Sequence, residues 1–130
     1  MTLGLSNFAA RLRESIRSGF RTENFGGLAL ELFALQFANN SAYRTICEAR
    51  RFTPLTVSHW SQVPVVPTGA FKELDLTCLS SAEWTHVFHS SGTTEQRPSR
   101  HFHNAESLAI YEASLWSWRV ENFRLPIADC

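Results

Sequence analysis

The residues best suited to chemistry lie in residues 88–101, whose sequence is FHSSGTTEQRPSRH. The centre of this stretch combines hydroxyl side chains with a glycine, which permits close approach of a ligand to the backbone. Successive backbone amides in such a turn form a concavity that binds anions. The sequence therefore predicts an anion-binding loop. Hydroxyl-rich turns also form for local hydrogen-bonding reasons, so a plain surface turn is the alternative. The expected cradle consists of Ser90, Ser91, Gly92, Thr93 and Thr94.

Ionisable side chains that follow the turn could complete such a site. Arg97 and Arg100 would add charge-assisted hydrogen bonds to phosphate oxygens if their guanidinium groups point inward. His101 could help to form a ligand pocket beside Arg100. The loop lacks the Gly-Lys-Ser/Thr ending of the Walker motif. It also lacks the G-x-S-x-G pattern that presents a nucleophilic serine, so we expect anion binding rather than attack by a serine of the loop.

Four histidines near the loop raise the question of a metal site. A zinc ion would need three or four ligands in a fitting geometry. His101 and His103 could share a face if that stretch is extended, whereas His86 and His89 would point to opposite faces of a strand. This separation breaks up the cluster. We therefore expect no metal site, and we interpret these histidines as polar residues that line a cleft.

Composition excludes some classes of partner. The chain has 12 basic and 12 acidic residues and a formal charge of zero, which argues against non-specific electrostatic binding to nucleic acid or to an anionic membrane. Cys47, Cys78 and Cys130 are widely spaced and suggest neither a disulfide framework nor a metal motif. The most apolar stretch, residues 28–38, is too short to span a bilayer. With no visible targeting segment, we expect a cytoplasmic protein without a membrane span.

The first part of the chain, residues 1–52, is expected to be a helical segment. Apolar residues spaced by three and four predict an amphipathic helix over residues 5–18. A second helix follows over residues 22–40, with Thr22 or Asn24 as its cap, and is apolar on nearly every face, as a helix buried on several sides would be. Ser41 is then expected to cap a short third helix.

The second part, residues 53–130, is expected to begin an α/β domain. Prolines exclude helix from most of residues 51–76, which we interpret as an extended, ordered connection because it contains apolar residues such as Trp60. Residues 84–89 have the composition of a strand, and Asn104 can cap a helix over residues 104–123. The order strand, loop, helix is typical of an α/β fold, and we expect this strand to belong to a parallel sheet.

Two motifs in this half resemble the Lux-type (bioluminescence-type) acyl-protein synthetase family of the adenylate-forming, acyl-activating superfamily. In that family a VPxxPTxxFK segment precedes an SSGTT…PSRH loop. Here WSQVPVVPTGAFK precedes SSGTTEQRPSRH, and the following ESLAIYEASLW is similar to the family's helix. The resemblance covers about residues 55–118. Glu95 replaces the glycine usual in the loop, and Ser99 stands where the wider superfamily has lysine, as in the Lux-type variant.

The resemblance implies an ATP-dependent ligase that uses Mg²⁺. Such an enzyme activates a fatty acid as an acyl-adenylate with loss of pyrophosphate and passes the acyl group to a protein thiol. The five residues of the cradle would wrap the phosphates of ATP, and Ser99 would close the turn. Arg100 would contact a phosphate or carboxylate, and Lys72 and His101 would belong to the pocket. Holding the triphosphate in this way stabilises the negative charge that develops on its oxygens.

The length of the chain limits what the resemblance implies. Enzymes of the superfamily are several times longer, and their remaining motifs lie downstream of this loop. We therefore expect the N-terminal portion of an adenylate-forming large domain, which is inactive alone and which another polypeptide could complete by supplying the rest of the sheet. An acyl- or aryl-CoA ligase of the phenylacetate type, with CoA as the acceptor, shares the loop and is one alternative. A non-catalytic anion-binding or partner module is the other.

Overall fold

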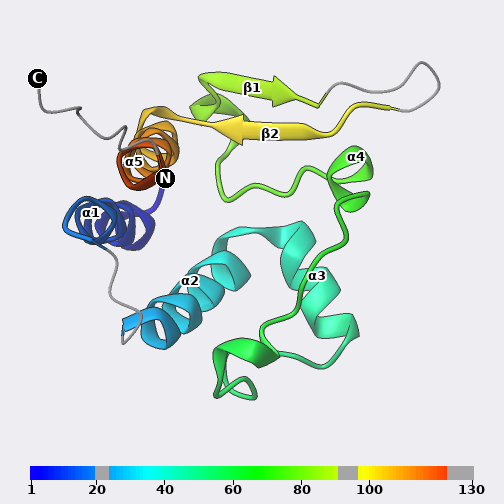
Figure 1. Ribbon diagram of the computed structural model, residues 1–130. Helices are drawn as coiled ribbons and strands as arrows, with labels where there is room; N and C mark the ends of the chain where they lie inside the picture. Colours follow the sequence, from blue (N-terminus) through cyan, green and yellow to red (C-terminus); the bar gives the residue numbers. More distant parts are fainter. Residues whose placement is uncertain (20–23, 91–96, 123–130) are drawn as a thin grey trace, which may run out of the picture.

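The computed structural model is helix-rich with a small sheet, and it describes residues 1–19, 24–90 and 97–122 (Figure 1). The longer helices are α1 (Leu3–Arg17), α2 (Phe25–Asn39), α3 (Ser41–Ala49) and α5 (Ala105–Asn122). Shorter helical turns are η2 (Trp60–Gln62), α4 (Ala70–Glu73) and η3 (Ser81–Glu83). The strands are β1 (His86–His89) and β2 (Arg100–His103). The mixture of helix and strand that the sequence predicts is therefore present.

The helices expected in the first part of the chain are confirmed, with small changes at their ends. Ser41, the expected cap of α3, is instead its first residue. Asn40 is the cap, because its backbone is extended and its Oδ1 accepts a hydrogen bond from the Tyr43 amide at 3.0 Å. Asn24 precedes α2 but makes no capping hydrogen bond through its side chain. Thr22 lies outside the described residues.

The main core joins the helices to the proline-rich connection. Phe33 of α2, Tyr43 and Cys47 of α3 and Val57 of the connection are buried together. The Tyr43 hydroxyl donates a hydrogen bond to the Pro64 carbonyl at 2.8 Å. The connection is ordered, as its apolar residues predict, and its only helical turns within the described residues are η2 and α4. This core draws on residues from both sides of the division that the sequence suggests after residue 52.

The sheet is where the structure differs most from the expectation. Within the described residues it has two strands, and β1 pairs with β2 in antiparallel orientation, with His86 opposite His103 and Phe88 opposite His101. The expected order of strand, loop, helix is wrong, because the hydroxyl-rich turn leads into a second strand before α5. The expected parallel sheet is not seen among the described residues, where the pairing of β1 with β2 is antiparallel. Ten residues of sequence lie between the end of β1 and the start of β2, whereas parallel neighbours need a crossover of about a dozen residues or more.

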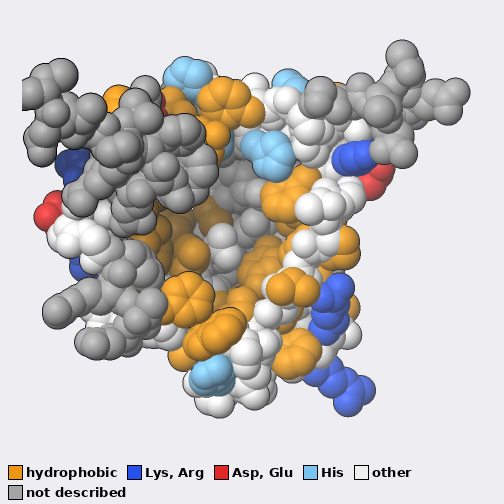
Figure 2. Space-filling view, viewed as in Figure 1, with side chains coloured by type: hydrophobic (Ala, Val, Ile, Leu, Met, Phe, Trp, Pro, Cys, Tyr) orange, Lys and Arg blue, Asp and Glu red, His pale blue; other side chains and the backbone are white. Residues whose placement is uncertain are grey.

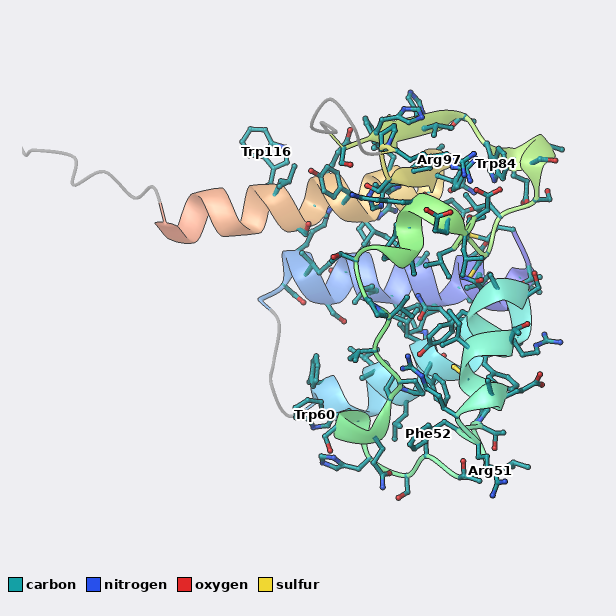
Figure 3. The ribbon with its side chains drawn as sticks, turned by 90° about the vertical axis from the view of Figure 1, so that its right-hand side faces the viewer. Arg51, Phe52, Trp60, Trp84, Arg97 and Trp116 are labelled. Carbon is teal, nitrogen blue, oxygen red and sulfur yellow. The ribbon has the colours of Figure 1, made fainter. Side chains whose placement is uncertain are left out.

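Helix α5 closes the fold against the beginning of the chain. It begins as predicted, because Asn104 Oδ1 accepts a hydrogen bond from the Ser107 amide at 2.9 Å. It packs along α1, and the Ser6 hydroxyl donates to the Glu106 carboxylate at 3.2 Å. Figure 3 shows α5 beside α1, with its far end extending past that helix. None of the helices in the described part of the chain is long and apolar enough to cross a membrane.

Candidate anion-binding site

The described ends of the hydroxyl-rich loop are tied together. The Ser90 amide donates to the Ser99 carbonyl at 3.2 Å, and the Ser99 amide donates to the Ser90 hydroxyl at 3.0 Å. The buried Ser99 hydroxyl is also 3.0 Å from Nε2 of His101. Three of the expected site residues therefore form one hydrogen-bonded group at the base of the loop. The other expected cradle residues, Ser91, Gly92, Thr93 and Thr94, lie outside the described residues.

The segment that contains Lys72 lies against the same strand. Helix α4 packs beside β2 (Figure 1). The Phe71 ring lies 5.1 Å from the His101 ring, between centroids and with a tilt of 30°. Lys72 is the next residue along α4, so the structure brings the element that contains it to the base of the loop. The two sequence motifs that carry the family resemblance are thus in direct contact, although 17 residues separate Lys72 from Ser90 in the chain.

Both arginines at the end of the loop face carboxylates. Arg100 Nη2 lies 2.7 Å from Asp75 Oδ1, and the Arg100 guanidinium is 5.9 Å above the Phe102 ring. Arg97 Nη1 lies 3.8 Å from Glu73 Oε2. Sequence reasoning missed these carboxylates. The sequence shows only that Glu73 and Asp75 follow Lys72. It does not show which basic side chain each carboxylate will pair with.

The histidines are arranged differently from the expectation. His101 and His103 share a face of β2 as predicted, since that stretch is extended. His86 lies directly opposite His103, so it joins this face, and Phe88 makes an edge contact with the His103 ring at 5.4 Å. Burial lowers the pKa of His103, and the neighbouring charges of His101 and His86 lower it further. Nevertheless, no group of three or more possible metal ligands is assembled among the described residues.

A second concave feature lies away from the loop. It is a groove of about 410 Å³ between α1, α2 and η2, with an almost wholly apolar lining. Figure 2 shows hydrophobic side chains gathered around a hollow over α2 and the segment that follows α3. Trp60 of the proline-rich connection lines this groove and is half exposed. Figure 1 places η2 at the end of the molecule opposite β1 and β2, so this part of the groove lies away from both strands.

Comparison of the chain with protein-family models, with curated proteins and with solved structures gives no match. The site is therefore interpreted from its own residues and from the motif resemblance described above.

Proposed function

We propose that this chain is the N-terminal part of an ATP-dependent acyl-protein synthetase of the Lux type, and that residues 88–101 bind the phosphates of ATP. The observation that carries the proposal is the contact between the two motifs. The resemblance assigns the loop to the phosphates of ATP and makes Lys72 of the other motif a candidate for a specific contact, so packing of the two motifs is what one shared site requires. Here the Phe71–His101 ring contact joins them, and the Asp75–Arg100 ion pair links the residues just after the first motif to the second.

The chemistry of the described residues suits a polyphosphate. Ser90 and Ser99 hold the two ends of the loop together before any ligand binds, which is a form of preorganisation. Arg97, Arg100 and Lys72 supply positive charge next to the loop, and guanidinium groups match phosphate oxygens well. In the proposed function the loop and the positive charge beside it hold the triphosphate, while the carboxylate of a fatty acid attacks its α-phosphorus and displaces pyrophosphate. The acyl group then passes from the adenylate to a protein thiol, and AMP leaves.

Magnesium is assigned no ligand within the described residues. The nearest carboxylates, Glu73 and Asp75, face arginines, and no set of oxygen ligands is assembled there. In the proposed function Mg²⁺ accompanies ATP, whose phosphate oxygens it binds and whose charge it partly neutralises.

The exposed hairpin supports the proposal that further polypeptide completes the domain. All four residues of β1 are exposed, including Val87 and Phe88 on its opposite faces. A two-stranded hairpin is marginally stable by itself, and apolar residues on both faces of an edge strand are typical of a strand that another element covers. We therefore infer that the remaining strands of the sheet come from outside these 130 residues.

A nucleotide titration of the 130-residue chain tests the assignment of the loop. In ¹H–¹⁵N spectra, millimolar Mg-ATP is expected to shift the amide signals of Ser90, Ser99 and His101 in a saturable way. AMP, which lacks the β- and γ-phosphates, is expected to leave them nearly unchanged. A Gly92→Val variant is the matched control, because a side chain at this position blocks close approach of the phosphates. Equal shifts with ATP and AMP, or no saturable shift with ATP, would overturn the proposal.

A further inference from the structure

The two arginines at the end of the loop have ion pairs of different quality. The Arg100–Asp75 pair is 2.7 Å long, and its side chains are 35% and 44% exposed. The Arg97–Glu73 pair is 3.8 Å long, and its side chains are 69% and 71% exposed. The first distance is that of a charge-assisted hydrogen bond, whereas the second exceeds hydrogen-bonding distance. The two pairs are therefore not equivalent.

The Arg100 guanidinium is held from two directions. Asp75 binds it on one side, and the Phe102 ring lies beneath it. Because Arg100 belongs to β2 and Asp75 follows α4, the ion pair fastens the segment after α4 to the hairpin. A ligand that drew Arg100 away would leave the half-exposed Asp75 carboxylate without its partner and would loosen this link. Arg100 is thus better suited to position β2 than to bind a ligand.

Arg97 is in the opposite situation. It lies next to the loop, and a long, exposed pair such as Arg97–Glu73 contributes little to stability. A phosphate group offers a guanidinium shorter and stronger bonds than this contact does. Exchange of the Glu73 carboxylate for a phosphate oxygen would therefore cost the protein almost nothing.

Resting on the proposed function, and refining it, we propose that Arg97 is the guanidinium that binds the phosphates, that Glu73 competes with them for Arg97, and that Arg100 is a positioning residue. If this assignment is right, removal of the Glu73 carboxylate must strengthen the binding of phosphate. The competing carboxylate lowers affinity in two ways: it occupies the guanidinium and it repels the anion. A purely structural role for the Arg97–Glu73 pair would give the reverse result.

The test compares inorganic tripolyphosphate and Mg-ATP as probes, with dissociation constants measured by calorimetry at fixed salt. Arg97→Gln is expected to weaken binding about tenfold, as loss of a charge-assisted hydrogen bond predicts. Glu73→Gln is expected to tighten binding about twofold to fivefold. Arg51→Gln is the matched control, since it also removes one positive charge but lies at the opposite end of the molecule from Arg97 (Figure 3). It is expected to change affinity less than twofold.

Arg100 needs a separate pair of variants. Arg100→Gln and Asp75→Asn are both expected to lower the melting temperature, because each breaks the ion pair. Binding is therefore measured with Arg100→Lys, which keeps the positive charge and is expected to stay folded. Near-normal affinity of Arg100→Lys supports the assignment. Loss of affinity in Arg100→Lys as large as in Arg97→Gln, or weaker binding by Glu73→Gln, overturns it. If the unmodified chain binds neither probe, the proposed function fails together with this inference. If it binds both and Arg97→Gln binds equally well, only this inference fails.

Discussion

The hydrogen bond between Tyr43 and the Pro64 carbonyl provides a direct test of how the proline-rich connection is held to the helices. Tyr43→Phe keeps the ring, and with it the edge contact to Phe33 at 6.2 Å, but removes the donor to a buried carbonyl. A buried acceptor without a partner costs about 1–3 kcal/mol. The unfolding entropy of 130 residues is roughly 270 cal/mol/K, so a loss of about 2 kcal/mol lowers the melting temperature by roughly 7 °C.

The chain supplies its own control for this measurement, because it has two tyrosines. Tyr111 on α5 is half exposed, so Tyr111→Phe removes a surface hydroxyl and is expected to change stability by less than about 0.5 kcal/mol. Thermal and urea unfolding of both variants, followed by circular dichroism, give the comparison. Equal destabilisation by the two substitutions would show that the Tyr43–Pro64 hydrogen bond does not hold the connection in place.

The remaining predictions concern protonation, thiol reactivity and catalysis. Since the folded state lowers the pKa of His103, stability is expected to be highest above pH 6.5 and to fall as the pH drops through that lowered pKa. His103→Gln should flatten this dependence and His89→Gln should not, as urea unfolding at several pH values will show. Cys47 is fully buried and burial raises its pKa, so in a Cys78→Ser, Cys130→Ser variant a thiol reagent should label it only as fast as the chain unfolds. Labelling faster than unfolding would contradict this burial. The 130-residue chain with ATP and a fatty acid is expected to release no more pyrophosphate than its Gly92→Val variant. Clear release above that control would show that these residues suffice for catalysis.

The helices could be predicted because their signals are local. Spacings of three and four identify α1, and Asn104 identifies the start of α5. The cap of α3 was misassigned because Asn40 and Ser41 are adjacent and both are good capping residues. Only the extended backbone at Asn40, which tertiary packing determines, distinguishes them.

The sheet and much of the site could not be predicted, because their signals are not local. The sequence of β2, RHFH, has one apolar residue and too little alternation to indicate a strand. Because β2 was not predicted, the register between β1 and β2 was unknown, and the pairing of His86 with His103 could not be foreseen. Likewise, Glu73 and Asp75 acquire their arginine partners only when α4 packs on β2. The hydroxyl-rich loop itself was visible because glycine and small polar residues mark a turn in any fold.

The packing of α1 along α5 sets the order in which this chain can fold during synthesis. Ser6 meets Glu106 across 100 positions of sequence, so this partner surface is synthesised long after α1. Contacts of such long range form slowly, because the intervening chain must first be brought into place. Until α5 leaves the ribosome, the side of α1 that packs against α5 is uncovered, whereas the contacts of α1 with α2 can already form. During that interval the contacts between α1 and α2 can hold α1 in place, while its uncovered side is open to aggregation or to a chaperone.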